Sequence, residues 1–276
     1  MDRFAYNRYG PAGVSDYYLR NYPQFNRVLL ATNDGRSYYN SFQLTFRRNT
    51  GALKFAANYT FSKSIDDSST EAFPNPVDSY NVRLQSARSD YDIPHTFNLT
   101  LDYSLPFGKG RHFAGNAPRW VGSILGGWDT GLIVVWQNGN VYSCFSGIAT
   151  GPTIDSSFCD YSGDRNIGKV MRRADGVYWL TDEEIGRFSY PIAGEIGSSG
   201  RNAFHGPRFF SVDLSLRKSF RIRESQTVSF RAEAYNLFNN VNFDVPNANL
   251  SEKTFGKISS TVPNPRILQV ALRYDF

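Results

Sequence analysis

The residues of this 276-residue chain that could do chemistry are few. Four acidic side chains flank one polar stretch, with Asp66 and Asp67 at its start and Asp90 and Asp92 near its end. Their carboxylates are the oxygen ligands that a hard cation such as calcium prefers. The alternative is an acidic loop solvated by water, which is the interpretation we favour. We therefore expect no metal site and no cofactor.

Other catalytic patterns are missing or incomplete. The three histidines, His95, His112 and His205, lie in separate connecting segments, which favours solvated side chains over a metal site. Residues 107–110 read Phe-Gly-Lys-Gly without the spacing of a phosphate-binding loop, so a turn is predicted. No Gly-x-Ser-x-Gly elbow occurs. We expect that the chain is not an enzyme.

Composition excludes two further classes. The net charge of +5 is modest and the basic residues are interspersed with acidic ones, so nucleic-acid binding is not expected. The longest notable apolar run, residues 132–136, is far too short for a membrane helix. Aromatic residues make up 16% of the chain, which suits a barrel with aromatic girdles at two interfaces.

Seven segments alternate between apolar and polar residues, the period of a two-faced strand. They are residues 41–47, 53–61, 97–105, 127–138, 210–217, 228–234 and 266–276. Their lengths approach the roughly 9–11 residues with which a tilted strand crosses a bilayer. The apolar face of the last segment consists of Leu268, Val270, Leu272, Tyr274 and Phe276. This aromatic ending resembles the terminal strand of bacterial outer-membrane β-barrels, which serves as their assembly signal.

The connections between these segments alternate in length. Residues 48–51 and 220–226 are short, residues 63–94, 139–208 and 236–265 are long, and residues 106–125 are intermediate. Outer-membrane barrels have short periplasmic turns and long external loops. If the last strand descends to the periplasm, every short turn is periplasmic. A soluble β-sandwich is the alternative, but it would need a second sheet against the apolar faces.

We predict an all-β fold: an antiparallel transmembrane β-barrel segment of about seven meander strands with long extracellular loops. Residues 1–37 are expected to form a loop, and residues 38–276 the strands and their connections. The apolar faces would meet the lipid of the outer membrane of a Gram-negative-type bacterium. The residues expected to face the lumen are Lys54, Asp102, Asp213, Arg217, Arg231, Glu233 and Arg273. Large plugged barrels have about 22 strands, so seven indicate part of a larger barrel.

Four motifs carry a family resemblance. They are Tyr-Thr-Phe-Ser-Lys-Ser-Ile-Asp-Asp-Ser-Ser at 59–69, Leu-Pro-Phe-Gly-Lys-Gly at 105–110, Tyr-Asn-Leu-Phe-Asn at 235–239 and Asn-Pro-Arg at 264–266. Their order and spacing resemble TonB-dependent outer-membrane receptors, most closely the Oar-like branch, over residues from about 22 to 276. The resemblance implies the carboxyl-terminal portion of a 22-stranded barrel, with the amino-terminal plug and TonB box outside this sequence.

The resemblance also implies a function and partners. Receptors of this kind import scarce ligands with energy delivered through TonB. We expect contacts with outer-membrane lipid, the barrel-assembly machinery, an unidentified extracellular ligand and, through the missing amino-terminal part, TonB. A structural or adhesive outer-membrane barrel without active transport is the alternative.

The long stretch 139–208 contains both cysteines of the chain, Cys144 and Cys159. In an exported protein a disulfide between them is favoured, and two unpaired thiols are the alternative. Thr181, with Glu184 three residues on, predicts the start of a short helix. Residues 255–259 predict a short strand. The aromatic residues of the stretch either contact ligand or pack the loop upon itself: Tyr142, Phe145, Tyr161, Tyr178 and Trp179.

Overall fold

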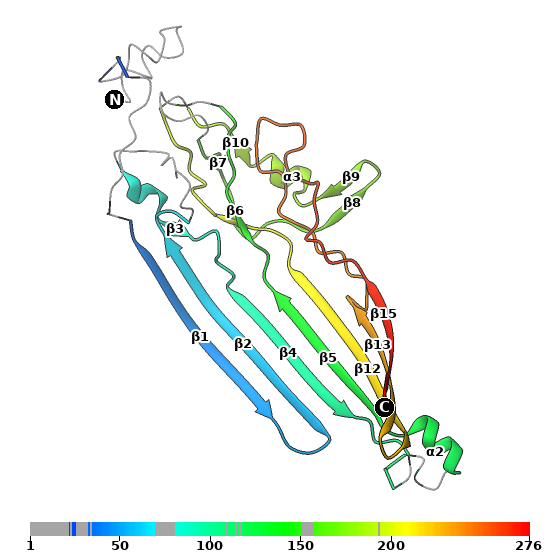
Figure 1. Ribbon diagram of the computed structural model, residues 1–276. Coiled ribbons are helices and arrows are strands. Elements are labelled where there is room, and N and C mark those ends of the chain that lie inside the picture. Colours follow the sequence, from blue (N-terminus) through cyan, green and yellow to red (C-terminus); the bar gives the residue numbers. More distant parts are fainter. Residues whose placement is uncertain are drawn as a thin grey trace.

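The computed structural model contains one large antiparallel sheet with a group of small elements beyond one of its ends (Figure 1). It describes residues 22, 24, 25, 33, 35–69, 81–108, 110–113, 115, 118–148, 150, 157–192 and 194–276. The loop expected over residues 1–37 lies almost entirely outside the described residues.

Seven long strands form the sheet and are ordered in it as they are in the chain. They are β1 (Ser37–Arg48), β2 (Leu53–Asp66), β4 (His95–Ser104), β5 (Trp128–Gln137), β12 (Phe209–Arg223), β13 (Gln226–Tyr235) and β15 (Ile267–Asp275). Each pairs with the next in antiparallel orientation. The predicted meander of a partial barrel is confirmed.

The register gives the sheet two faces of opposite character. Because side chains alternate across a strand, cross-strand partners share a face. Tyr59 pairs with Phe97, and Phe97 pairs with Trp136, so aromatic residues follow one another across three strands. On the opposite face, Lys54 pairs with Asp102. We call these the apolar face and the polar face.

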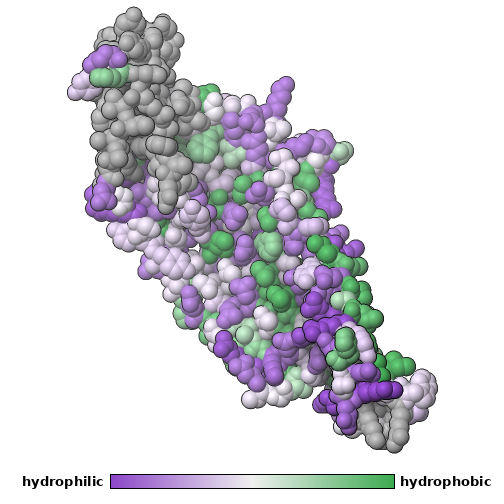
Figure 2. Space-filling model, viewed as in Figure 1, coloured by the Kyte–Doolittle hydropathy of each residue, from purple (hydrophilic) through white to green (hydrophobic). Residues whose placement is uncertain are grey.

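No second sheet covers the apolar face within the described residues. Phe46 is 67% exposed and Leu272 is 73% exposed. Of the apolar residues that the structure describes as buried, only Val212 belongs to one of the seven long strands. Figure 2 shows hydrophobic side chains gathered along the β15 edge of the sheet. A soluble sandwich would bury this surface, whereas a sheet in lipid leaves it open.

Short and long connections lie at opposite ends of the sheet (Figure 1). Residues 49–52, 105–127 and 224–225 connect strands at the end where the chain terminates, which we call the short-turn end. The described residues of 67–94, 138–208 and 236–266 lie at the other, the long-loop end. The predicted alternation is confirmed. In outer-membrane barrels the short turns are periplasmic.

Two strands extend well beyond their predicted carboxyl ends. Strand β2 continues to Asp66, because residues 62–66 pair with residues 37–41 of β1 although their side chains are mostly polar. Strand β12 continues to Arg223, where a charged turn was expected, since Arg221 still pairs with Thr227. In β2 backbone pairing continues past the hydrophobic alternation, whereas in β12 Phe220 and Ile222 continue the apolar side of the strand.

The connection between β4 and β5 contains a helix that the sequence did not predict, α2 (Arg119–Leu125). Its last turn is held by Lys218, which lies on the apolar face yet is only 4% exposed. The Lys218 ammonium donates to the carbonyls of Ser123, Ile124 and Gly126 at 2.5, 2.7 and 2.6 Å. These are the carbonyls that a helix end leaves without partners, and a cation there also matches the helix dipole.

The remaining elements lie in the connections at the long-loop end. They are η3 (Val82–Gln85), β3 (Ala87–Arg88), β6 (Val141–Tyr142), β7 (Asp160–Tyr161), β8 (Met171–Arg173), β9 (Gly176–Tyr178), α3 (Asp182–Ile185), β10 (Phe188–Ser189), β11 (Phe204–His205) and β14 (Lys257–Ile258). Thr181 caps α3 in a capping box with Glu184, as predicted. Strand β14 confirms the strand predicted at 255–259. Among the described residues, no helix has the length and apolar character needed to cross a membrane.

Replacing Lys218 with methionine should release α2 from the sheet. Methionine preserves most of the apolar stem but removes three charge-assisted hydrogen bonds, for a loss of about 2 kcal/mol of docking free energy. That corresponds to a roughly thirtyfold larger undocked population. Chymotrypsin should then cleave faster within residues 106–127. Lys54→Met, on the polar face, should leave the cleavage rate unchanged, and equal rates for both variants would contradict the role of Lys218.

Candidate functional site

The polar face carries the charged residues that were predicted to face the lumen. The register places them all on this one side of the sheet: Lys54, Asp102, Asp213, Arg217, Arg231, Glu233 and Arg273. Both signs of charge occur on this face, and Arg217 lies directly opposite Arg231 in the register. Such a surface offers hydrogen-bond donors and acceptors to a polar ligand.

One ion pair spans three strands of this face. Arg217 of β12 reaches across β5 to Asp102 of β4, with 2.7 Å between Nη2 and Oδ1. Gly131 of β5 lies between them, and a Cβ built there would be 2.6 Å from the Ser215 hydroxyl oxygen. The glycine therefore leaves open the space that the pair crosses. Both charged side chains are about half exposed, so the pair adds little stability and remains accessible.

Further charges pair within their own strands. The Arg231 guanidinium lies 3.4 Å from the Glu233 carboxylate, and that of Arg273 lies 2.8 Å from Asp275. Asp213 instead accepts a hydrogen bond from the Asn236 backbone N–H at 2.8 Å. Asp213 therefore helps to end β13 at the long-loop end.

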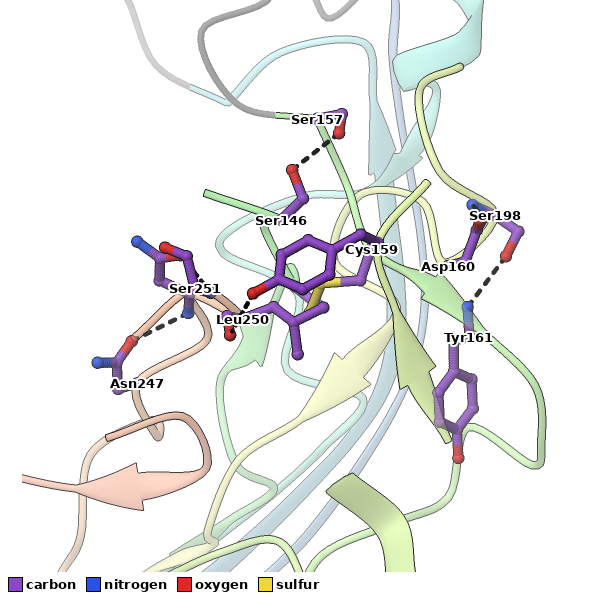
Figure 3. The surroundings of a disulfide bond; sticks show 12 residues. Ser146, Ser157, Cys159, Asp160, Tyr161, Ser198, Asn247, Leu250 and Ser251 are labelled. Carbon is purple, nitrogen blue, oxygen red and sulfur yellow. Dashed lines mark hydrogen bonds between the residues drawn. A yellow bond between two sulfur atoms is a disulfide. The ribbon is translucent and has the colours of Figure 1, made fainter. Parts of the chain in front are cut away.

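Beyond the polar face lies a compact group of loops, the described residues of 138–208 and 236–266, which we call the loop module. Cys144 and Cys159 form a disulfide at its centre and both are fully buried (Figure 3). The bond closes a segment with a sequence separation of 15, for which restriction of the unfolded chain contributes about 3 kcal/mol. The Ser146 and Ser157 hydroxyls hydrogen bond beside it at 2.9 Å.

Most of the loop aromatics pack upon one another. Tyr142 and Tyr161 both contact the ring of Phe204, at centroid distances of 5.6 and 5.1 Å. Burial raises the pKa of the Tyr142 hydroxyl above its usual range. The Trp179 indole N–H donates to the His205 carbonyl at 3.1 Å. These residues fit the self-packing interpretation, whereas Phe145 is 42% exposed and accessible to a ligand.

The histidines do not converge. His95 lies in β4 rather than in a connection as expected, and its Nδ1 is 2.7 Å from the Tyr59 hydroxyl. His112 contacts the ring of Phe113. Burial lowers the pKa of His205 below its usual value. Within the part of the chain that the structure describes, no group of three or more His, Cys, Asp or Glu could hold a metal ion.

The acidic cluster is held by arginines, which corrects the prediction of a solvated loop. Asp66 and Asp92 are buried. Arg201 lies 2.7 Å from Asp66 and 3.3 Å from Asp90, while Arg88 lies 2.6 Å from Asp92. The decisive partner, Arg201, is 135 residues from Asp66 in sequence, and no local pattern around it indicates this role.

Arg201 thereby joins the loop module to the connection between β2 and β4. Its guanidinium also donates to the Gln85 carbonyl at 3.3 Å and to the Ser69 hydroxyl at 2.5 Å. The neighbouring Asn202 amide donates to the Arg88 carbonyl at 2.7 Å. Asp66 lies on the polar-face side of β2, so the loop module is fixed at the long-loop end of the polar face.

Two of the sequence motifs meet in space. Asn236, buried and with a positive φ of 46°, donates from its side-chain amide to the Asn264 carbonyl at 2.6 Å and to the Asn240 carbonyl at 2.9 Å. The motif at 105–110 has a different constraint, because a Cβ on Gly108 would lie 2.7 Å from the Gly126 Cα. These motif residues set the shape of the connections.

Comparison with protein-family models identifies one match, the outer membrane beta barrel domain, over residues 1–269. The chain belongs to this family. The match places the barrel domain in the outer membrane of a Gram-negative-type bacterium. Searches of curated proteins and of solved structures find no match.

Sequence reasoning missed two residues that organise the barrel domain, Arg201 and Lys218. For Lys218 a signal existed: it takes the apolar position after Leu214 and Leu216 in the alternation of β12. A lysine at a lipid-facing position requires a partner.

Replacing Arg201 with methionine should open the junction between the two loops. Removing one partner of a buried ion pair leaves the other charge uncompensated, at a cost of about 3–5 kcal/mol. Hydrogen exchange at the Ser89 and Asn202 amides would report the opening. Arg187→Met is the matched control, because its ion pair with Glu183 is exposed and its loss should change protection little. Equal effects of the two substitutions would contradict the assigned role.

The helix α3 should make the loop module sensitive to acid. Burial raises the pKa of the Glu184 carboxyl, but hydrogen bonds from the Thr181 and Gly168 backbone N–H groups outweigh this, leaving the pKa below its ordinary value of 4.5. The folded state therefore binds this proton less readily than the unfolded state. Its stabilising contribution is fully present above the ordinary value and is lost as pH falls through the folded pKa.

Denaturant unfolding of the module, followed by Trp179 fluorescence, should show lower stability at pH 4 than at pH 7. Glu184→Gln should reduce this difference, because glutamine retains an acceptor without titrating. Glu183→Gln, at an exposed neighbouring position, should preserve it. An unchanged difference in the Glu184 variant would exclude this carboxyl as the source.

Proposed function

We propose that this chain forms the carboxyl-terminal part of the barrel of a TonB-dependent receptor, which imports a ligand across the outer membrane without converting it chemically. The observation that carries the proposal is the polar face, with accessible charges of both signs below a rigid loop module. A ligand recognised outside would meet this face on its way inward. The four motifs, in the order expected of the Oar-like branch, and the outer-membrane location support it.

The edges of the sheet support membership of a larger barrel. In the described residues, β1 and β15 each pair with a long strand on one side only. Strand β1 is exposed along its whole length. Within a bilayer, unpaired backbone N–H and C=O groups are too costly to persist. We infer that further strands complete the ladder on both edges, as a 22-stranded receptor barrel would provide.

The loop module supports recognition at the outer face. Its core is held by a disulfide and by aromatic rings packed against one another, and Arg201 fixes it to the neighbouring connection. A preorganised surface loses less conformational entropy when a ligand binds. Phe145 and Tyr190, which are 42% and 49% exposed, are the aromatic side chains in this region that we propose for ligand contact.

Active import can be tested by comparing what cells remove from their medium. We expect at least one compound whose depletion, measured by mass spectrometry, is lost in a strain lacking this gene and also in a strain lacking TonB. The intact gene should restore depletion in the first strain. If depletion is unchanged in both strains while surface attachment or envelope integrity is lost without this gene, the structural or adhesive alternative holds instead.

A further inference from the structure

An apolar pocket of about 270 Å³ opens at the short-turn end of the sheet. Its walls are Leu105, Phe107, Leu125, Trp128 and Leu216. All five side chains are hydrophobic. Sites for soluble ligands usually add a few polar groups that fix the orientation of the ligand, and this wall has no charged or amide side chain. The pocket therefore suits a hydrocarbon chain.

The pocket is continuous with the apolar face. Trp128 pairs with Lys218 on that face, and Leu216 pairs with Thr130, which in turn pairs with Tyr103. Leu105 continues this side of β4, and its N–H donates to the Trp128 carbonyl at 2.8 Å. The floor of the pocket is thus part of the surface that meets lipid in an outer-membrane barrel.

The connection between β4 and β5 supplies the outer wall. Phe107 and Leu125 come from this connection, and Leu125 is the last residue of α2. The helix is held against the sheet, because Lys218 binds its last turn and the Trp128 indole N–H donates to the Ile124 carbonyl at 2.9 Å. The pocket is therefore a fixed feature of the connection.

The exposed side of α2 is also apolar. Trp120 is 69% exposed and Ile124 is 58% exposed. In water these side chains would be unfavourably hydrated, whereas tryptophan is enriched where a membrane meets water. The helix lies at the short-turn end of the sheet, the end at which β15 also finishes (Figure 1). In an outer-membrane barrel the end with the short turns is the periplasmic end.

We propose that the pocket binds an acyl chain of a membrane phospholipid, and that α2 lies in the interface of the periplasmic leaflet. Lipid is the expected occupant because the pocket opens from the apolar face, which lipid covers in an outer-membrane barrel. Leu125 of the connection and Leu216 of the sheet line the pocket from two sides, and their contacts would hold one chain longer than the open apolar face holds its neighbours.

Tryptophan quenching in vesicles can test this occupancy. The full-length protein would be placed in phospholipid vesicles that contain a minor fraction of phosphatidylethanolamine with brominated acyl chains, since bromine quenches tryptophan on contact. The fluorescence difference between the protein and its Trp128→Phe variant gives the emission of Trp128, which lines the pocket. The corresponding difference for Trp136→Phe gives the emission of Trp136, which lies on the same face farther along β5.

We expect the quenched fraction for Trp128 to be about twice that for Trp136, because a retained chain adds to the lipid that surrounds both. Leu125→Phe should fill the pocket and bring the two fractions together. Leu132→Phe, on the same face outside the pocket, should preserve the difference. Because Leu125 belongs to α2, its substitution leaves the strand pairing intact, and Leu216→Phe provides a second way to fill the pocket.

Equal quenching of Trp128 and Trp136 in the unsubstituted protein would overturn the proposal. The proposal would also be overturned if Trp128 remained more strongly quenched than Trp136 in both Leu125→Phe and Leu216→Phe. The stronger quenching would then come from lipid outside the pocket. Neither result depends on ligand import, so this test can fail while the proposed transport function stands.

Discussion

The structure depends on one constraint: a chain that crosses lipid must satisfy its backbone hydrogen bonds within itself. Antiparallel pairing of consecutive strands meets this requirement across the interior of the sheet. Once that register is set, the alternation of side chains determines the character of the two faces of the sheet. The face toward lipid must be apolar, and the other face is free to carry charge. The protein therefore needs no core beneath the sheet. Its buried apolar side chains are concentrated in the loops outside the bilayer.

The two ends of the sheet differ in their surroundings and in how their connections are stabilised. At the long-loop end, water surrounds the chain, so the loop module has a core of its own around Phe204 and a disulfide. At the short-turn end the chain needs only to reverse direction, yet the connection between β4 and β5 adds α2 and holds it with Lys218. The sheet thus carries the polar loop module at its long-loop end and the apolar helix α2 at its short-turn end.

Sequence patterns predicted the seven strands, the two faces and the alternation of loop lengths, because each is a local consequence of period and length. The cap of α3 was equally local, since Thr181 and Glu184 are three residues apart. Features that depend on distant partners were not predictable. Asp66 was predicted to be solvated because its partner, Arg201, is distant in sequence and lies beside it only in the folded chain. The extension of β2 to Asp66 was missed because Lys63 interrupts the apolar side of the strand after Phe61.

The contact between Arg201 and Asp66 also limits how the outer surface can diversify during evolution. The loop between β5 and β12 can accept new residues on its exposed side, but an exchange of the whole loop for one from another barrel would leave Asp66 buried without a countercharge. A successful exchange must bring its own arginine or be accompanied by a neutral residue at position 66. The two loops are expected to vary as a pair.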